Sequence, residues 1–118
     1  MFDSINVLGK ELESCCHNPK TGFFRDGYCN TDYADNGLHT VCIIATSDFL
    51  EFSKSVGNDI GSPMPEFDFP GIKPGNKWCL CAGRWLEAYK VGKAPPVVLE
   101  STHEETLAVI PMGYLKEF

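Results

Sequence analysis

The chain has 118 residues, the size of one ordinary domain, and we expect residues 1–118 to fold as a single unit around one core. A composition of 43% hydrophobic and 22% charged residues is that of a globular protein and excludes a disordered one. The net charge of -6, with its basic residues scattered, argues against nucleic acid and anionic membranes as partners.

The sequence also bears on location. It has no apolar run long enough to span a membrane, and residues 1–20 lack the apolar core of a signal peptide. We therefore expect a soluble cytoplasmic protein, exported only if a leader has been removed. In a reducing compartment the six cysteines should be thiols that act as buried hydrophobes, metal ligands or reactive groups.

The first 38 residues are rich in Gly, Asn, Asp and Cys, and they predict a loop-rich segment. Within it, Arg25 and Asp26 follow two phenylalanines, and they either pair locally or face a cleft. Cys15 and Cys29 could form a covalent clamp on this segment, because the adjacent thiols of Cys15 and Cys16 seldom bridge each other without strain.

The middle of the chain begins with an apolar, β-branched run at 39–46, typical of a strand covered on both faces. The Thr-Ser-Asp sequence at 46–48 then supplies N-cap chemistry for a helix that ends near Gly57. Four prolines between Gly61 and Gly75 exclude regular structure and indicate a long loop.

The last third predicts two further strand and helix pairs. They are a strand at 77–81, a helix at 82–91, a strand at 97–101, and a helix capped by Thr102 with Glu105 and ended by Pro111. This order favours an α+β fold in which helices pack on a small sheet as a two-layer α/β sandwich. Parallel strands would gather their C-terminal ends on one rim, whereas an antiparallel or mixed sheet would scatter them.

Six segments together resemble a known family. In chain order they are NVLG, TGFFRDGYC, HTVC, FLEFSKSVGND, FPGIKPGNKWCLCAGRW and APPVVLESTH. They resemble the bacterial domain-of-unknown-function family 2237 over nearly the whole chain. The resemblance implies a stand-alone α+β domain without an assigned activity or catalytic residue, in which Cys16 is an addition beside the family's usual cysteine at Cys15.

The candidate site centres on Cys79 and Cys81, whose thiols lie on one face of a strand because Leu80 points to the other. Two small apolar residues packed under a helix would give the same pattern. Cys81 also directly precedes a helix, where the helix dipole and Arg84 would stabilise a thiolate.

A nearby imidazole would complete a catalytic site. His103 at the start of the last helix would be held neutral by the dipole and could accept a proton from Cys81, although a surface histidine beside two glutamates fits the same pattern. His39 is interpreted as a strand-start residue. The predicted catalytic residues are Cys81, His103 and Arg84, and the predicted binding residues are Cys79, Trp78, Trp85, Arg25, Asp26 and Thr102.

These residues favour a cysteine-lined pocket that binds or modifies a small molecule through Cys81, with Cys79 as a resolving thiol or second ligand. One alternative is a non-catalytic interaction module that presents Phe67 and Phe69 to a protein partner. Another is a structural metal site, for which cysteines and histidines suffice in number but lack Cys-x-x-Cys spacing. We predict no cofactor and assign no metal ligand.

Overall fold

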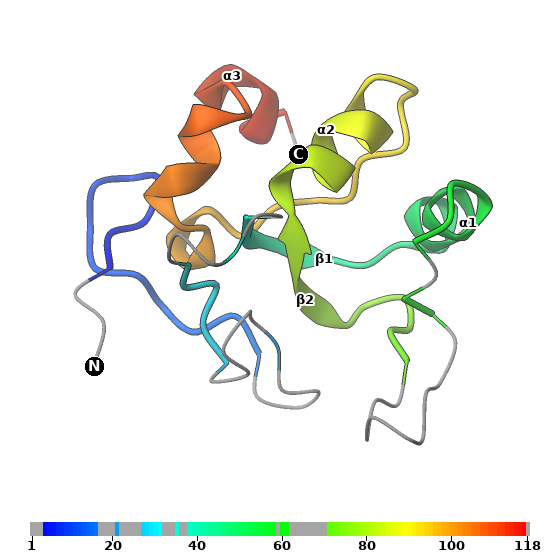
Figure 1. Cartoon of the computed structure of the whole chain (residues 1–118). Coiled ribbons are helices and arrows are strands. Elements are labelled where there is room, and N and C mark those ends of the chain that lie inside the picture. The colour runs from blue at the N-terminus through cyan, green and yellow to red at the C-terminus, as the bar shows by residue number, and fades with distance from the viewer. Residues whose placement is uncertain are drawn as a thin grey trace.

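The computed structural model describes the chain at residues 4–16, 21, 27–31, 35, 38–58, 60–61 and 71–117. Within this part, two strands cross the centre of the molecule and short helices lie around them (Figure 1). The elements are β1 (His39–Ile44), α1 (Ser47–Ser55), β2 (Lys77–Cys81), α2 (Ala82–Tyr89), the 3₁₀ helices η2 (Leu99–Ser101) and η3 (Glu104–Ala108), and α3 (Met112–Leu115). The chain has a small α+β fold, as its element order predicted.

β1 and β2 pair in antiparallel fashion. Their C-terminal ends therefore do not share one rim, as parallel strands would. The register places Ile43 opposite Trp78 and Cys42 opposite Cys79, and a bulge separates His39 from Val41. Because side chains alternate along a strand, Cys42 and Cys79 lie on one face and their apolar neighbours on the other.

The predicted first helix is confirmed as α1, and its cap explains where it starts. The hydroxyl of Thr46 accepts a hydrogen bond from the amide of Phe49 at 3.1 Å, which satisfies one of the free N–H groups of the first turn. Thr46 therefore ends the extended segment, and β1 closes at Ile44 instead of 46. The helix ends before Gly57, whose φ of 88° suits glycine.

The predicted third strand at 97–101 is wrong. Val97 forms only an isolated bridge with Ile43, and η2 follows from Leu99. A local hydrogen bond turns the backbone after this bridge, since the hydroxyl of Thr102 donates to the carbonyl of Val98 at 2.8 Å.

The predicted cap of the last helix is also wrong. The residue that caps η3 is His103, whose Nδ1 accepts the amide of Glu105 at 3.1 Å. Thr102 is unavailable for this role because its hydroxyl also accepts the amide of Cys42 at 3.1 Å. The segment that begins here is a short 3₁₀ helix, and α3 starts after Pro111.

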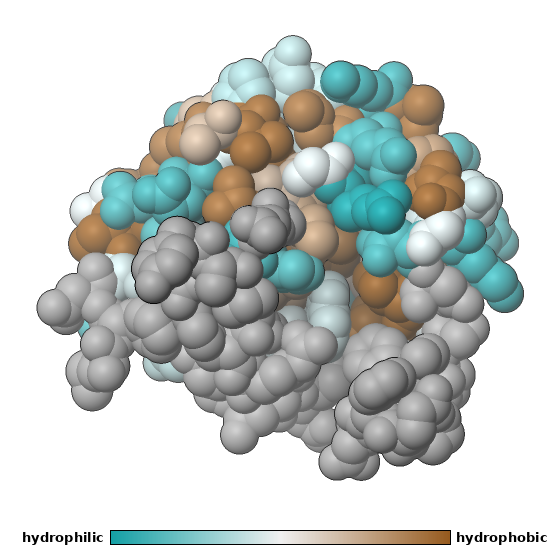
Figure 2. Space-filling model, in the orientation of Figure 1, coloured by the Kyte–Doolittle hydropathy of each residue, from teal (hydrophilic) through white to brown (hydrophobic). Residues whose placement is uncertain are grey.

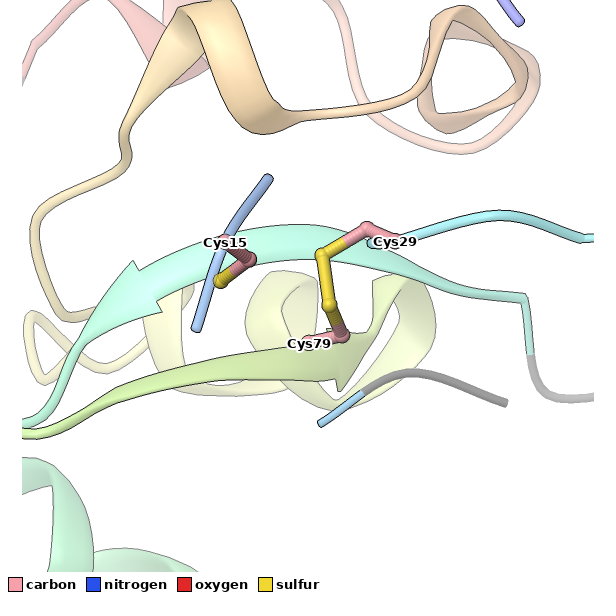
Figure 3. Close-up of side chains that lie close together, drawn as sticks. All are labelled: Cys15, Cys29 and Cys79. Atoms are coloured by element: carbon pink, nitrogen blue, oxygen red, sulfur yellow. A yellow bond between two sulfur atoms is a disulfide. The ribbon is translucent and has the colours of Figure 1, made fainter. Parts of the chain in front are cut away.

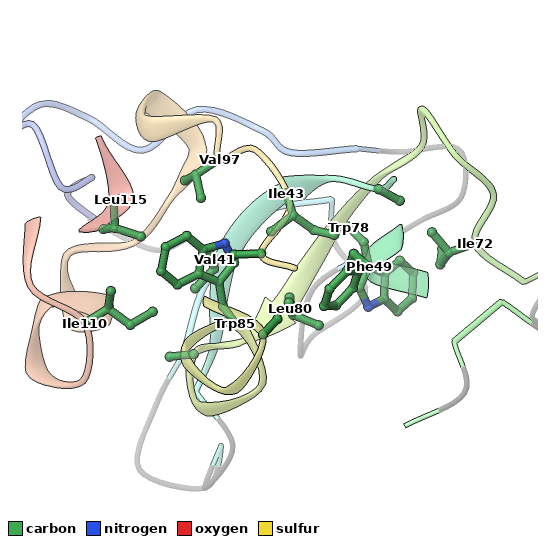
Figure 4. Close-up of a cluster of buried hydrophobic side chains, with 14 of the residues drawn as sticks. Val41, Ile43, Phe49, Ile72, Trp78, Leu80, Trp85, Val97, Ile110 and Leu115 are labelled. Atoms are coloured by element: carbon green, nitrogen blue, oxygen red, sulfur yellow. The ribbon is translucent and has the colours of Figure 1, made fainter. Parts of the chain in front are cut away.

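The apolar face of the strand pair forms the main core (Figure 4). Trp85 of α2 is fully buried in this core, and its indole N–H donates to the carbonyl of Pro95 at 3.0 Å. Phe49 of α1 and Ile72 lie toward one end of the same cluster, and Ile110 lies toward the other. The opposite face holds a second buried cluster of four cysteines, Cys15, Cys29, Cys42 and Cys79.

The described residues of the N-terminal segment are loop-rich, as predicted, and Asn6 organises the backbone around it. The buried side chain of Asn6 donates to the carbonyls of Glu11 and Glu100, and it accepts from the amides of Leu8 and Lys10. An asparagine amide can satisfy loop backbone groups in this way. Asn6 thus ties the start of the chain to the segment that follows Val97.

The surface and helix lengths bear on the expected partners. In the described part of the chain, no helix is long and apolar enough to cross a bilayer. On the face shown in Figure 2, exposed apolar side chains are interspersed with polar ones.

Candidate functional site

Cys81 stands at the junction between β2 and α2. It is the last residue of the strand and the N-cap residue of the helix, as predicted. Its thiol is free and half-buried, so the sulfur is neither sealed in the core nor bonded to another cysteine. The N-terminal end of a helix favours negative charge, which is the form in which sulfur is a nucleophile.

His39 is the register partner of Cys81 across the strand pair. Its Nδ1 lies 2.6 Å from Oδ1 of Asp35, four residues earlier. The Asp35 side chain is 0% exposed, whereas that of His39 is 36% exposed. A buried carboxylate thus holds one edge of an imidazole whose remainder reaches solvent.

Three further hydrogen bonds fix the carboxylate and the turn around it. Oδ2 of Asp35 accepts the backbone amide of His39 at 2.9 Å and the hydroxyl of Thr31 at 3.1 Å. Leu38 has a φ of 48°, in the left-handed region that residues other than glycine seldom adopt, and its amide donates to the carbonyl of Asp35. Its carbonyl accepts the amide of Ala82 at 3.0 Å, which joins this turn to the start of α2.

The environment of His39 raises its pKa to about 9. The hydrogen bond with Cys81 is the largest cause, burial opposes it, and the hydrogen bond and charge of Asp35 add to the rise. The imidazole is therefore protonated at neutral pH. Since Nδ1 is directed at Asp35, Nε2 is the ring nitrogen left to donate to the sulfur of Cys81.

The arrangement is a line of sulfur, imidazole and carboxylate. A protonated imidazole stabilises negative charge on a neighbouring sulfur, and it can deliver its proton to a group that the sulfur attacks. The carboxylate orients the ring and stabilises its positive charge. Cys81, His39 and Asp35 are thus positioned for thiol-dependent nucleophilic chemistry.

The structure brings Cys81 to His39 in place of the predicted His103. Burial lowers the pKa of His103, against the raising effect of Glu104 and Glu105, so this imidazole is neutral, although for a different reason from the helix dipole. It is 8% exposed, and its Nδ1 is occupied as the cap of η3. These contacts give His103 a structural role.

Arg84 is directed elsewhere than the thiol. Its guanidinium lies 3.3 Å from Oε1 of Glu87 and 3.5 Å from the carbonyl of Val56 at the end of α1. These contacts give it a bridging position between α1 and α2, and both side chains of the ion pair are more than a third exposed. Such a pair contributes little to stability.

The predicted binding residues are dispersed. Trp78 and Trp85 are buried in the main core, 6% and 0% exposed, so neither indole walls a site open to solvent. Thr102 supports the backbone of Cys42. Arg25 and Asp26 lie outside the described residues.

The prediction that Cys79 is a resolving thiol is wrong, because Cys79 is bonded to Cys29. The predicted clamp between Cys15 and Cys29 is also wrong, since Cys15 is bonded to Cys42. Of the six cysteines, all within the described residues, Cys16 and Cys81 are free. The expectation of six thiols therefore fails for four of them.

Sequence reasoning missed His39 and Asp35. His39 was interpreted as the start of a strand, which is correct, but its partner across the sheet depends on the antiparallel register. The available signal was an aspartate four residues before a histidine that opens the best strand in the chain. This signal becomes informative only when the strand register is known to place Cys81 opposite His39.

The comparisons with known proteins identify a family and leave the chemistry open. A family model described as an uncharacterized protein conserved in bacteria, DUF2237, matches residues 5–118. A comparison with curated proteins gives no match. Because the match spans essentially the whole chain, this protein belongs to the DUF2237 family.

Proposed function

We propose that Cys81 is a nucleophilic thiol that binds or modifies a small molecule with an electrophilic carbon, assisted by His39 and Asp35. The observation that carries the proposal is the continuous hydrogen-bonded line from Asp35 to the His39 imidazole and on to Cys81. This line replaces the Cys81, His103 and Arg84 set that the sequence suggested.

The covalent step is attack on a carbonyl or similarly polarised carbon. The sulfur of Cys81 donates an electron pair to form a carbon–sulfur bond, the carbon–oxygen π bond breaks, and the oxygen takes a proton from Nε2 of His39. Asp35 orients and stabilises the imidazolium before the transfer. With a leaving group on the carbon, the adduct collapses to a thioester, and the leaving group departs with its electron pair and the proton.

Two features beyond the pair itself support this assignment. Cys81 is free and half-buried, and it is the N-cap residue of α2. Asp35 is fully buried and Leu38 has a left-handed backbone, an unfavourable combination that neighbouring structure must compensate. Such combinations cluster at functional sites.

Alkylation by iodoacetamide tests the proposal, because the chain carries a matched control in Cys16, its other free and half-buried cysteine. The rate at each cysteine is measured by mass spectrometry from about pH 5 to 9. Cys81 should react at least about tenfold faster than Cys16 near pH 6.5. His39→Gln should remove this advantage and leave the Cys16 rate unchanged, whereas equal rates at both cysteines in the unmodified protein would overturn the proposal.

The alternative of an interaction module remains a prediction. Phe67 and Phe69 lie outside the described residues, and the buried cysteines that this alternative requires are four of the six. It predicts that Cys81 and Cys16 react equally slowly.

A cytoplasmic location also remains a prediction. The two disulfides weigh against it, because disulfides persist mainly in oxidising compartments. Counting thiols in protein isolated under alkylating conditions from each cell fraction decides the matter.

A further inference from the structure

We propose that the four cysteines of the two disulfides, Cys15, Cys29, Cys42 and Cys79, form a tetrahedral zinc site when the protein is reduced. This site lies on the face of the strand pair opposite the main core, and it uses neither Cys81 nor His39. It is therefore independent of the proposed function.

The sulfur atoms already gather in one place. Those of Cys15, Cys29 and Cys79 all lie within 4.8 Å of one another. Cys42 lies outside this group of three, but it shares their buried cluster and its sulfur is bonded to that of Cys15. Figure 3 shows the side chain of Cys15 beside the disulfide between Cys29 and Cys79. Two separate structural disulfides do not require this proximity.

The distances between the sulfur atoms suit zinc. Zinc binds thiolates at about 2.3 Å in a tetrahedron, which places neighbouring sulfurs about 3.8 Å apart. To reach this spacing, the Cys15 sulfur would approach those of Cys29 and Cys79 by no more than about 1 Å, while the two sulfurs of each disulfide would separate once their bond is reduced. All four cysteines are 0–5% exposed, as befits a closed structural site without an open position.

The backbone around the cluster is fixed by hydrogen bonds that survive reduction. The amide of Cys79 donates to the hydroxyl of Thr21 at 2.7 Å, and that of Cys42 donates to the hydroxyl of Thr102 at 3.1 Å. Cys42 and Cys79 are also register partners in β1 and β2. On the N-terminal side, the amide of Cys15 donates to the carbonyl of Gly27 at 2.7 Å. Reduction would thus leave the four thiols close together.

The chemistry balances with a dithiol as the reductant. Two equivalents of dithiol supply four electrons and four protons, and they are oxidised to their own disulfides while the protein gains four thiols. Zinc then binds four thiolates and releases four protons. Soft thiolate ligands select zinc over hard cations, and zinc does not itself undergo oxidation or reduction.

Zinc would cross-link the reduced chain as the disulfides cross-link the oxidised one. In both states a cross-link joins the loop-rich N-terminal segment to the strand pair, and metal binding contributes its free energy to folding. The fold could then persist in a reducing compartment, where the disulfides would open.

Cobalt and zinc binding to the whole reduced chain tests the inference. The protein is reduced with a dithiol, freed of reductant by gel filtration under argon, and titrated with Co²⁺. We expect one Co²⁺ per chain, with the visible absorption of tetrahedral thiolate coordination, displaced by one equivalent of Zn²⁺. Zinc should also raise the midpoint of thermal unfolding of the reduced protein by at least about 5 °C.

Matched variants locate the site. Cys42→Ser and Cys79→Ser each remove one ligand and should weaken metal binding by more than about a hundredfold, since even lost supporting contacts cost 10–100-fold. Cys16→Ser and Cys81→Ser should leave the cobalt spectrum unchanged. Octahedral cobalt absorption in the reduced protein, a reduced chain that stays unfolded by circular dichroism with zinc present, or loss of binding in Cys81→Ser instead would each overturn the proposal.

Discussion

His39, the first residue of β1, lies opposite Cys81, the last residue of β2, where the strand pair opens toward α2. One residue of each strand thus contributes one half of the thiol and imidazole pair, and the hydrogen bond between them is the largest cause of the raised pKa of His39. Local sequence does not bring these two residues together, so the pair is a product of the sheet register.

Replacing the buried carboxylate should lower the proton affinity of His39. Asp35→Asn keeps the side-chain shape but removes the charge and the charged acceptor of the ring N–H, both of which raise the pKa of His39. The NMR titration of His39 should move down from about 9 toward its ordinary value, and alkylation of Cys81 near neutral pH should slow.

The neighbouring hydroxyl supplies the control for that change. Thr31→Val removes one hydrogen bond to Oδ2 of Asp35 and leaves the contact with the ring in place. It should move the His39 titration much less than Asp35→Asn does. An unchanged titration in Asp35→Asn would contradict the assignment of Asp35 as the orienting carboxylate.

The raised pKa of His39 also makes stability depend on pH. The unfolded chain has its ordinary value near 6.5, so the contribution is fully present below about 6.5 and is lost as the pH rises through about 9. After allowance for solvent screening of this partly exposed side chain, we expect about 1 kcal/mol. Urea unfolding of the unmodified protein and of His39→Gln should differ most near pH 6 and converge above pH 9, and a constant difference across this range would refute the assignment.

His103 should matter for stability and not for thiol reactivity. His103→Ala removes the cap of η3 and should cost about 1 kcal/mol in thermal or denaturant unfolding. His103→Asn offers an amide oxygen at the cap and should recover part of this loss. In both variants Cys81 should be alkylated at the rate of the unmodified protein, and a slower rate would restore His103 as its partner.

Each disulfide of the oxidised protein should contribute several kcal/mol, more for the longer loop. The Cys15–Cys42 bond joins residues 27 apart and the Cys29–Cys79 bond joins residues 50 apart. Double alanine variants should lose about 2–4 kcal/mol each in denaturant unfolding, with the second pair losing about 0.5 kcal/mol more. A larger loss for the shorter loop would point to residual structure in the unfolded chain.

Local patterns in the sequence were enough for several elements. The Thr46 cap, the β-branched run from His39 and the strand-to-helix junction at Cys81 all follow from neighbouring residues, and the structure has each of them. The segment at 97–101 misled because valine and leucine fit a strand, while the hydroxyl of Thr102 bonds back to Val98. A pattern of apolar residues does not reveal whether a side-chain hydrogen bond will compete with strand pairing.

The site depended on relationships between distant parts of the chain. The pairing of six cysteines cannot be deduced from their spacing, and the meeting of His39 with Cys81 requires both the antiparallel direction and the bulge at Thr40. The choice of His103 as the partner of Cys81 depended on parallel strands whose C-terminal ends would share one rim. Only Cys81 was recognisable in advance, because its position before a helix is a local property.

The left-handed turn at Leu38 couples the position of Asp35 to that of Cys81. Its amide donates to the carbonyl of Asp35 and its carbonyl accepts the amide of Ala82, the first residue of α2, so one residue links both ends of the line. Leu38→Gly would relax this turn and let both ends drift together. A displacement of this turn, for example by a bound molecule, would therefore change the alignment of Asp35, His39 and Cys81 together.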